Sequence, residues 1–123
     1  MKITLLSDER LRLDNTPGPL TIEAESADMS YSPFHMVASG LATCTLAVLH
    51  SWASHAGIEA DSLAIEVAWT FGEKPHRVAS YDVRLHWPDL AEERMAAASR
   101  AATLCAVHST LAHPPSITVE VKE

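Results

Sequence analysis

The side chains with the most reactive chemistry in this chain are its two cysteines, Cys44 and Cys105. A thiolate can act as a nucleophile, bind a metal or react with a peroxide. A free cysteine can instead pack as a small apolar side chain. Two features favour chemistry over packing. Cys44 lies in the most apolar stretch of the chain, and Cys105 lies at or near the start of a short helical pattern whose N-terminal dipole would favour a thiolate.

Histidine is the second residue type that could do chemistry here. His108 follows Cys105 by three residues, on the same side of a helix, where it could lower the pKa of the thiol, move a proton or make a structural hydrogen bond. An alternative is a zinc site formed by Cys44, Cys105, His108 and His35. Structural zinc motifs have closer ligand pairs, so we expect no metal. The remaining histidines are predicted to be packing or surface residues: His50, His55, His76, His86 and His113.

Residues 34–57 contain no Asp, Glu, Lys or Arg, and Ser32-Pro33 and Gly57 bound them as helix start and stop signals. The length would suit a membrane span, but three histidines and several Ser and Thr residues argue against one. A helix without a charged face is expected to be buried on every side. One subunit of this size cannot cover such a helix, so we predict a homodimer and no membrane partner.

The flanking segments predict the elements that position these residues. Alternation predicts strands over residues 63–71, 81–87 and 117–121, and a hairpin loop over residues 72–76. Further strands are expected over residues 2–7, 10–14 and 20–25, and helices over residues 89–103 and 105–112. Helices separated from antiparallel strands indicate an α+β fold, and the length of 123 residues indicates one domain over residues 1–123.

The formal net charge is −7, and no basic cluster is present, so we expect no nucleic-acid partner. The first residues form too short an apolar run for a signal peptide, and two cysteines do not make a secreted disulfide framework. These observations predict a cytoplasmic protein with reduced thiols.

Two motifs together resemble a known family. Ser32-Pro33, Met36, Leu41 and Ala42-Thr43-Cys44 resemble the first-cysteine helix of the osmotically inducible protein C (OsmC) and organic hydroperoxide resistance family. Cys105-Ala106-Val107-His108 resembles its second-cysteine motif, commonly C-P-V-H-x-x-L. The resemblance covers roughly residues 30–123. It implies an α+β OsmC-like fold with antiparallel sheets and a long buried central helix, in an intertwined homodimer.

The resemblance also implies an activity. Cys44 would reduce an organic hydroperoxide, Cys105 would resolve the product as a disulfide, and a cellular dithiol would reduce that disulfide, without a cofactor. His108 could assist. The arginine that supports the first cysteine in the family is assigned to Arg12, although Arg10 is a second candidate.

One position departs from the family pattern. Phe34, followed by His35, stands where the peroxidases carry an acid that joins the arginine. Phe34 is expected to form an apolar wall, to leave the pKa of Cys44 nearer neutrality and to favour bulky hydroperoxides. Phe34, His35 and Trp52 are the expected substrate-binding residues. A third reading is a dimeric protein that holds an apolar ligand against Phe34, Trp52 and Trp69 without turnover.

Overall fold

The computed structural model describes residues 2–7, 10–14, 23–24 and 33–122 of the chain. It contains two compact units, Met1–Ser39 and Gly40–Glu123. The boundary falls inside the long helix α1 (Pro33–Ala56), which contributes its first turns to one unit and the rest to the other.

The first unit contains an antiparallel sheet in the order β1-β2-β3. Strands β1 (Lys2–Ser7) and β2 (Arg10–Asp14) have the predicted bounds. They pair from Lys2 opposite Asp14 to Ser7 opposite Arg10. Strand β3 (Glu23–Ala24) falls within the predicted strand 20–25, whose other residues lie outside the described part of the chain.

Helix α1 confirms the predicted helix and ends before Gly57, whose positive φ of 68° suits the residue that follows a helix. Its buried positions Leu41, Thr45, Leu49 and Ala53 recur every four residues and form one stripe. Other positions, such as His50, are exposed. By length and hydropathy the helix could cross a membrane. Within one chain the described elements cover this stripe alone, as expected for a subunit too small to cover the whole helix.

Strands β4 (Ala64–Gly72) and β5 (Arg77–His86) form the predicted hairpin, with Ile65 opposite Leu85 and Val67 opposite Val83 on its half-buried face. The alternation that predicts the strand 63–71 would put Phe71 on the same face as Ile65 and Val67, but the structure interrupts the alternation there. A register shift between Thr70 and Phe71 turns the ring outward, where it is 47% exposed and stacks on His76 at 5.0 Å between ring centroids.

The predicted helix 89–103 is shorter in the structure. A 3₁₀ turn, η1 (Glu92–Arg94), precedes α2 (Met95–Ala102). The backbone first folds back, since the Leu90 N–H donates to the Trp87 carbonyl at 3.1 Å, and both side chains enter the core. Helix α3 (Ala106–Ala112) confirms the second predicted helix, with Cys105 as its N-cap residue.

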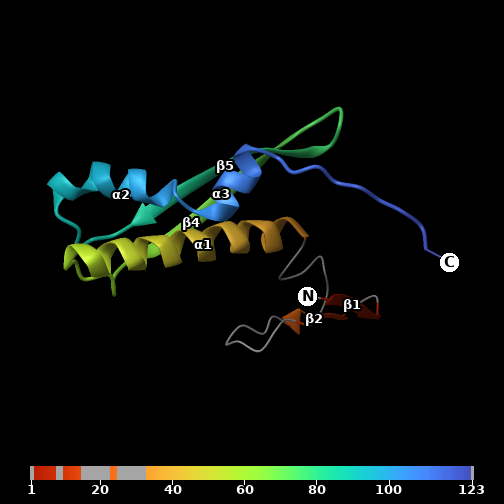
Figure 1. Cartoon of the computed structure of the whole chain (residues 1–123), viewed down its shortest axis with the longest axis horizontal. Coiled ribbons are helices and arrows are strands. Elements are labelled where there is room, and N and C mark those ends of the chain that lie inside the picture. Colours follow the sequence, from red (N-terminus) through yellow and green to blue (C-terminus); the bar gives the residue numbers. More distant parts are fainter. Residues whose placement is uncertain (1, 8–9, 15–22, 25–32, 123) are drawn as a thin grey trace. The chain divides into compact units, whose positions relative to one another are not determined.

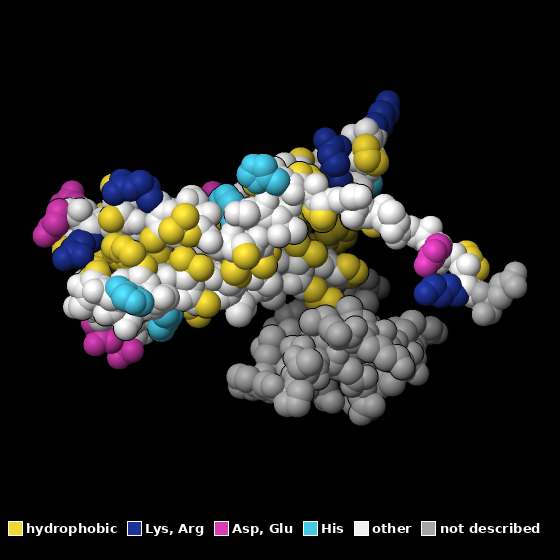
Figure 2. Space-filling view, viewed as in Figure 1, with side chains coloured by type: hydrophobic (Ala, Val, Ile, Leu, Met, Phe, Trp, Pro, Cys, Tyr) yellow, Lys and Arg dark blue, Asp and Glu magenta, His cyan; other side chains and the backbone are white. Residues whose placement is uncertain are grey.

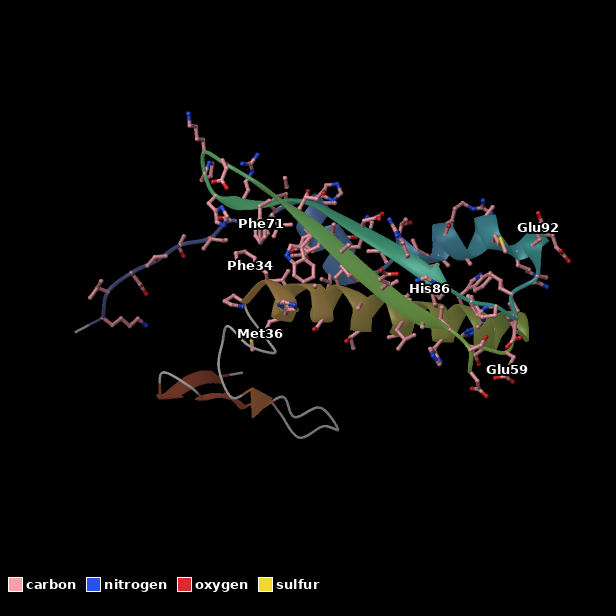
Figure 3. The ribbon with its side chains drawn as sticks, turned by 180° about the vertical axis from the view of Figure 1, so that it is seen from behind. Phe34, Met36, Glu59, Phe71, His86 and Glu92 are labelled. Carbon is pink, nitrogen blue, oxygen red and sulfur yellow. The ribbon has the colours of Figure 1, made fainter. Side chains whose placement is uncertain are left out.

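The core of the Gly40–Glu123 unit lies between the hairpin and the two helices α1 and α2 (Figures 1 and 3). On the face shown in Figure 2, apolar side chains gather in a band along α1 and α2. The buried cluster consists of Leu49, Ala53, Trp87, Leu90, Ala98 and Ala101. This packing holds the middle of α1, which carries Cys44, and the segment after α2, which carries Cys105, in the same unit.

The predicted strand 117–121 is wrong for the single chain, because residues 114–122 form no strand. Ile117, Val119 and Val121 are 83%, 91% and 94% exposed. A strand needs a neighbouring strand to pair its backbone groups, and among the described residues this segment has none.

Candidate active site: the cysteine pair

Cys44 and Cys105 lie side by side, although they are far apart in the sequence. Cys44 comes from the middle of α1 and is half-buried, while Cys105 follows α2 and is 0% exposed. Both are free thiols, and the neighbouring Cys105 thiol is the largest cause of a lowered pKa at Cys44. The buried stripe of α1 brings Cys44 here, since its neighbour Thr45 belongs to that stripe.

Cys105 is held by the first turn of α3. Its extended backbone, with φ −62° and ψ 130°, places the side chain over the open end of the helix. The backbone N–H of His108 donates to Cys105 Sγ at 3.4 Å between nitrogen and sulfur. Sulfur thus takes the role that a serine or aspartate oxygen has at most helix starts.

Uncharged hydrogen-bond donors hold the pKa of Cys44 below its ordinary value. The largest cause is the hydrogen bond with Cys105, and the backbone N–H of Val107 is next. Burial of the sulfur acts in the opposite direction, and the N–H of Ala106 adds a smaller lowering effect. The start of α3 therefore supplies N–H groups to both sulfurs, and the lowered pKa increases the share of Cys44 that is thiolate at neutral pH.

The structure places His108 beside the pair through its backbone. Its side chain is exposed and lines a small pocket with Thr45 and Tyr81. His108 contacts Cys105 through its backbone N–H. The i, i+3 spacing noted in the sequence therefore describes a helix cap.

The other predicted site residues occupy different places. Phe34 and His35 lie in the first turn of α1, in the Met1–Ser39 unit. Arg12 lies in β2 opposite Thr4 and Glu23, and its side chain is outside what the structure describes.

The two tryptophans of the third reading belong to the folded body of the Gly40–Glu123 unit. Trp52 packs edge-on against Trp87 at 6.0 Å between ring centroids, and it contacts the core cluster. Trp69 is a half-buried residue of β4. Trp52 comes from the part of α1 two turns beyond Cys44, so the structure assigns it to packing and not to the cysteine pair.

Within the described ranges, no three His, Cys, Asp or Glu side chains come together as a metal site would require. The zinc reading of Cys44, Cys105, His108 and His35 therefore finds no support in this part of the chain.

The sequence did not indicate the backbone groups of Ala106 and Val107 as part of the site. The position of Cys105 at a predicted helix start was a signal that N–H donors would be near a sulfur. We expected these donors to act on Cys105, and the His108 N–H does so, while the N–H groups of Ala106 and Val107 lower the pKa of Cys44. Which sulfur they reach depends on how α3 packs against α1.

Comparisons with known proteins agree with this fold. The sequence profile described as OsmC-like protein matches residues 25–120. A crystal structure from Psychrobacter arcticus 273-4, described as an osmotic stress induced and detoxification response protein, is similar in fold, with a TM-score of 0.77 and 20% sequence identity. The likeness covers 89% of this chain and 85% of that one. No curated protein matches the chain. Because the profile spans most of the sequence and includes both cysteines, the chain belongs to the OsmC-like protein family.

Proposed function

We propose that this protein reduces organic hydroperoxides, with Cys44 as the peroxide-reactive thiolate and Cys105 as the resolving thiol. The observation that carries the proposal is the contact between two free cysteines, of which Cys44 has the lowered pKa. A thiolate reacts with peroxides and a thiol does not, so the sulfur with the lowered pKa is assigned the first step. Membership of the OsmC-like family, whose profile covers both cysteines, supports the assignment.

The reaction needs two steps before the protein is reduced again. In the first step, the Cys44 thiolate attacks the outer oxygen of ROOH, the O–O bond breaks, and the alkoxide leaves and takes up a proton as the alcohol. Cys44 is then a sulfenic acid. In the second step, Cys105 attacks the Cys44 sulfur, an S–S bond forms, and the hydroxyl group leaves as water. A cellular dithiol then reduces the disulfide by thiol–disulfide exchange.

The arrangement of the pair suits the second step. Disulfide formation requires that the two sulfurs approach to bonding distance with little backbone movement. The Cys105 thiol is near enough to Cys44 to be the largest cause of its lowered pKa. The cap contact from His108 holds the Cys105 sulfur at the start of α3.

We further propose that the working form is a homodimer in the cytoplasm. The support is the amount of apolar surface that one chain leaves exposed. Leu104, next to Cys105, is 74% exposed, and Ile117, Val119 and Val121 are almost fully exposed. A second copy would cover these side chains, since exposed apolar clusters on soluble chains mark contact surfaces.

The test of the peroxidase proposal is a peroxide-consumption assay with cumene hydroperoxide and an excess dithiol. The wild-type chain should consume peroxide, and mass spectrometry of the oxidised protein should find one Cys44–Cys105 disulfide within a chain. Cys44→Ser should abolish consumption. In Cys105→Ser, Cys44 should accumulate as sulfenic or sulfinic acid.

Hydrogen peroxide is the matched substrate control, and the bulkier organic peroxide should react faster. The proposal fails if both thiols are lost slowly and at equal rates in wild type and in each single variant. In that case the two residues are packing cysteines that happen to be adjacent.

A further inference from the structure

Reduction of a disulfide can begin at either of its two sulfurs, because each is a possible target for an incoming thiolate. In the disulfide proposed above, the two targets are Cys44 and Cys105. Attack on one sulfur expels the other as a thiolate, so the two routes give different mixed disulfides. The exposure of the two cysteines distinguishes these routes.

Cys105 is closed off by its own chain. Its exposed fraction is 0%, although none of the residues of α3, the helix that it caps, is buried. The backbone N–H of His108 donates to Cys105 Sγ at 3.4 Å, so part of the sulfur surface already contacts the helix. A second copy of the chain packed on this one would add cover to Cys105 and not remove it.

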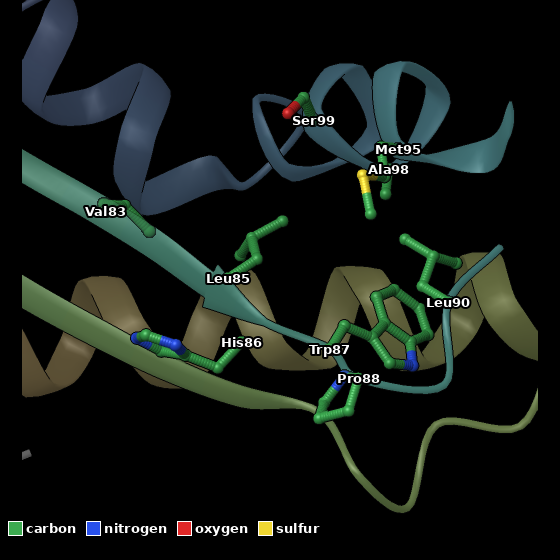
Figure 4. A pocket seen from close by; sticks show the side chains of 9 residues that line it. All are labelled: Val83, Leu85, His86, Trp87, Pro88, Leu90, Met95, Ala98 and Ser99. Carbon is green, nitrogen blue, oxygen red and sulfur yellow. The ribbon is translucent and has the colours of Figure 1, made fainter. Parts of the chain in front are cut away.

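The two pockets that share lining residues from β5 and α2 do not open onto Cys105. Their volumes are about 510 Å³ and 250 Å³, and Figure 4 shows the larger one. The smaller pocket reaches Thr103 and His108, which precede and follow Cys105 in the sequence. Neither pocket has Cys105 in its lining, so a small molecule in either one stays apart from this sulfur.

Cys44 is the more accessible of the two residues. It is half-buried on α1. Gly40, four residues earlier, and Ala47, three residues later, adjoin it on the helix surface, and both are exposed. A Cβ atom added at Gly40 would meet no atom within 4 Å, so the surface around this turn is open. An incoming thiolate can therefore approach Cys44 without opening the fold.

The chemistry of the leaving group opposes this difference in access, but its effect is smaller. Because the pKa of Cys44 is lowered, Cys44 would be the better leaving group, which favours attack on Cys105. Exchange rates follow the pKa of the leaving thiol gradually, whereas a sulfur with no exposed surface is reached only after local opening of the fold. The His108 N–H also stabilises Cys105 as a departing thiolate. Access therefore selects the route.

We infer that the reducing dithiol attacks the Cys44 sulfur, so that Cys44 reacts in turn with the peroxide and with the reductant. The inference rests on the proposed function for the presence of the Cys44–Cys105 disulfide. A thiolate of the reductant forms an S–S bond to Cys44, the Cys44–Cys105 bond breaks, and Cys105 leaves as a thiolate that takes up a proton.

The second thiol of the reductant completes the reaction. As a thiolate it attacks the reductant sulfur of the mixed disulfide, the reductant leaves as a cyclic disulfide, and Cys44 is restored as a thiolate. A monothiol lacks this step, and Cys105, released beside Cys44, can attack Cys44 again and expel the monothiol. A dithiol competes with this reversal because its second thiol is held in the same molecule.

The test traps the first mixed disulfide. The full-length protein is oxidised with diamide, which needs no peroxide, and is then treated briefly with excess β-mercaptoethanol. Acid stops the exchange, and N-ethylmaleimide labels the released thiol in denaturant. Trypsin separates the two cysteines, because Arg77 and Arg100 lie between them. At the earliest times we expect β-mercaptoethanol on Cys44 and N-ethylmaleimide on Cys105, in at least about tenfold excess over the reverse labelling.

A matched pair of single-cysteine variants measures access directly. Cys105→Ser retains only Cys44, and Cys44→Ser retains only Cys105. Their reaction with the uncharged reagent dipyridyl disulfide is compared at the high-pH plateau, where both sulfurs are thiolates and their pKa values no longer contribute. Cys44 should react at least about tenfold faster than Cys105 in the folded protein, because Cys105 must wait for local opening. In urea the two rates should agree within about twofold, because the fold no longer covers either sulfur.

Two results would overturn the inference. They are β-mercaptoethanol mainly on Cys105 or equally on both cysteines, and equal rates of the two variants in the folded state. Failure of diamide to join Cys44 to Cys105 would overturn it together with the proposed resolving step. A protein that forms the Cys44 adduct but consumes no peroxide would support the inference and contradict the peroxidase proposal alone.

Discussion

Among the residues that the structure describes, the groups that lower the pKa of Cys44 carry no charge. The donors that lower its pKa are the Cys105 thiol and the backbone N–H groups of Val107 and Ala106. The family resemblance led us to expect Arg12 in this role, and its side chain lies outside the described residues. Uncharged donors stabilise a thiolate through short-range hydrogen bonds, so they act only while α3 stays in place beside α1.

The first prediction concerns the hydrogen bond between the two cysteines. Cys105→Ala removes the donor and should raise the pKa of Cys44, whereas Cys105→Ser keeps a hydroxyl donor and should raise it less. The pH dependence of Cys44 alkylation by iodoacetamide measures this pKa. The rate should rise with pH through the pKa, and the curve of Cys105→Ala should lie at higher pH than that of Cys105→Ser. Identical curves would show that Cys105 does not donate to Cys44.

The lowered pKa of Cys44 also makes the free energy of unfolding depend on pH. A thiol whose pKa is lowered in the folded state stabilises the fold at pH values above the pKa of the unfolded thiol. This contribution disappears as the pH falls through the lowered pKa of the folded state. Chemical denaturation of wild type and Cys44→Ala across this interval should show stability falling toward low pH in the wild type by more than in the variant.

At the scale of elements, the backbone at the start of α3 can be tested by substitution, because its conformation there is compatible with proline. Cys105 has a ψ of 130°, a conformation that a following proline accepts. Ala106 is the first residue of the helix, where proline is favoured because its missing N–H has no partner within the helix.

The second prediction is that Ala106→Pro folds with an unchanged or higher Tm and raises the pKa of Cys44 slightly, since one N–H donor is lost. Thermal unfolding and the alkylation assay measure the two effects. Thr110→Pro is the contrasting variant, because an interior proline breaks the short helix and should cost about 3 kcal/mol or more. If Ala106→Pro lowers the Tm as much as Thr110→Pro, the assigned start of α3 is wrong.

Helix α1 is held in the Gly40–Glu123 unit by its buried stripe, which also sets the position of Cys44. The third prediction compares neighbouring residues of this helix. Leu49 is 0% exposed, and Leu49→Ala should cost about 2–5 kcal/mol of unfolding free energy because it removes core contacts and leaves a cavity.

His50 is exposed, and His50→Ala should change the unfolding free energy by less than about 0.5 kcal/mol. Urea denaturation of both variants provides the comparison. Similar values for the two variants would mean that the buried stripe does not anchor the helix.

At the scale of the whole molecule, a strand-like segment near the C-terminus pairs with no strand among the residues that the structure describes. Ile117, Val119 and Val121 alternate with Thr118, Glu120 and Lys122, a period of two that suits a strand with one buried face. Their exposure in the single chain supports the proposal that a second copy provides the missing neighbour.

The fourth prediction is that sedimentation equilibrium finds a dimer at micromolar concentration, and that Val119→Asp weakens it. Thr118→Asp adds the same charge on the opposite face of the segment and should have little effect. A stable folded monomer in the wild type would contradict the dimer proposal. Equal weakening by both variants would show that the segment does not use one apolar face.

Local patterns in the sequence were enough to predict most elements. Alternation in residues 63–71 and 81–87 predicted the β4–β5 hairpin, and the helix signals at Pro33 and Gly57 predicted α1. Such signals are read from neighbouring residues, so a single sequence contains them. The two cysteine motifs likewise indicated the OsmC-like family, which the profile match confirms.

Only the tertiary structure decided which groups meet. It assigned the start of α3 to Cys44 as well as Cys105, placed Trp52 against Trp87 and turned Phe71 outward at a bulge. It also left residues 117–121 without strand pairing. These outcomes depend on contacts between residues far apart in the chain. A periodic pattern shows that a residue prefers a buried face, but it does not say which other element, or which other chain, will cover that face.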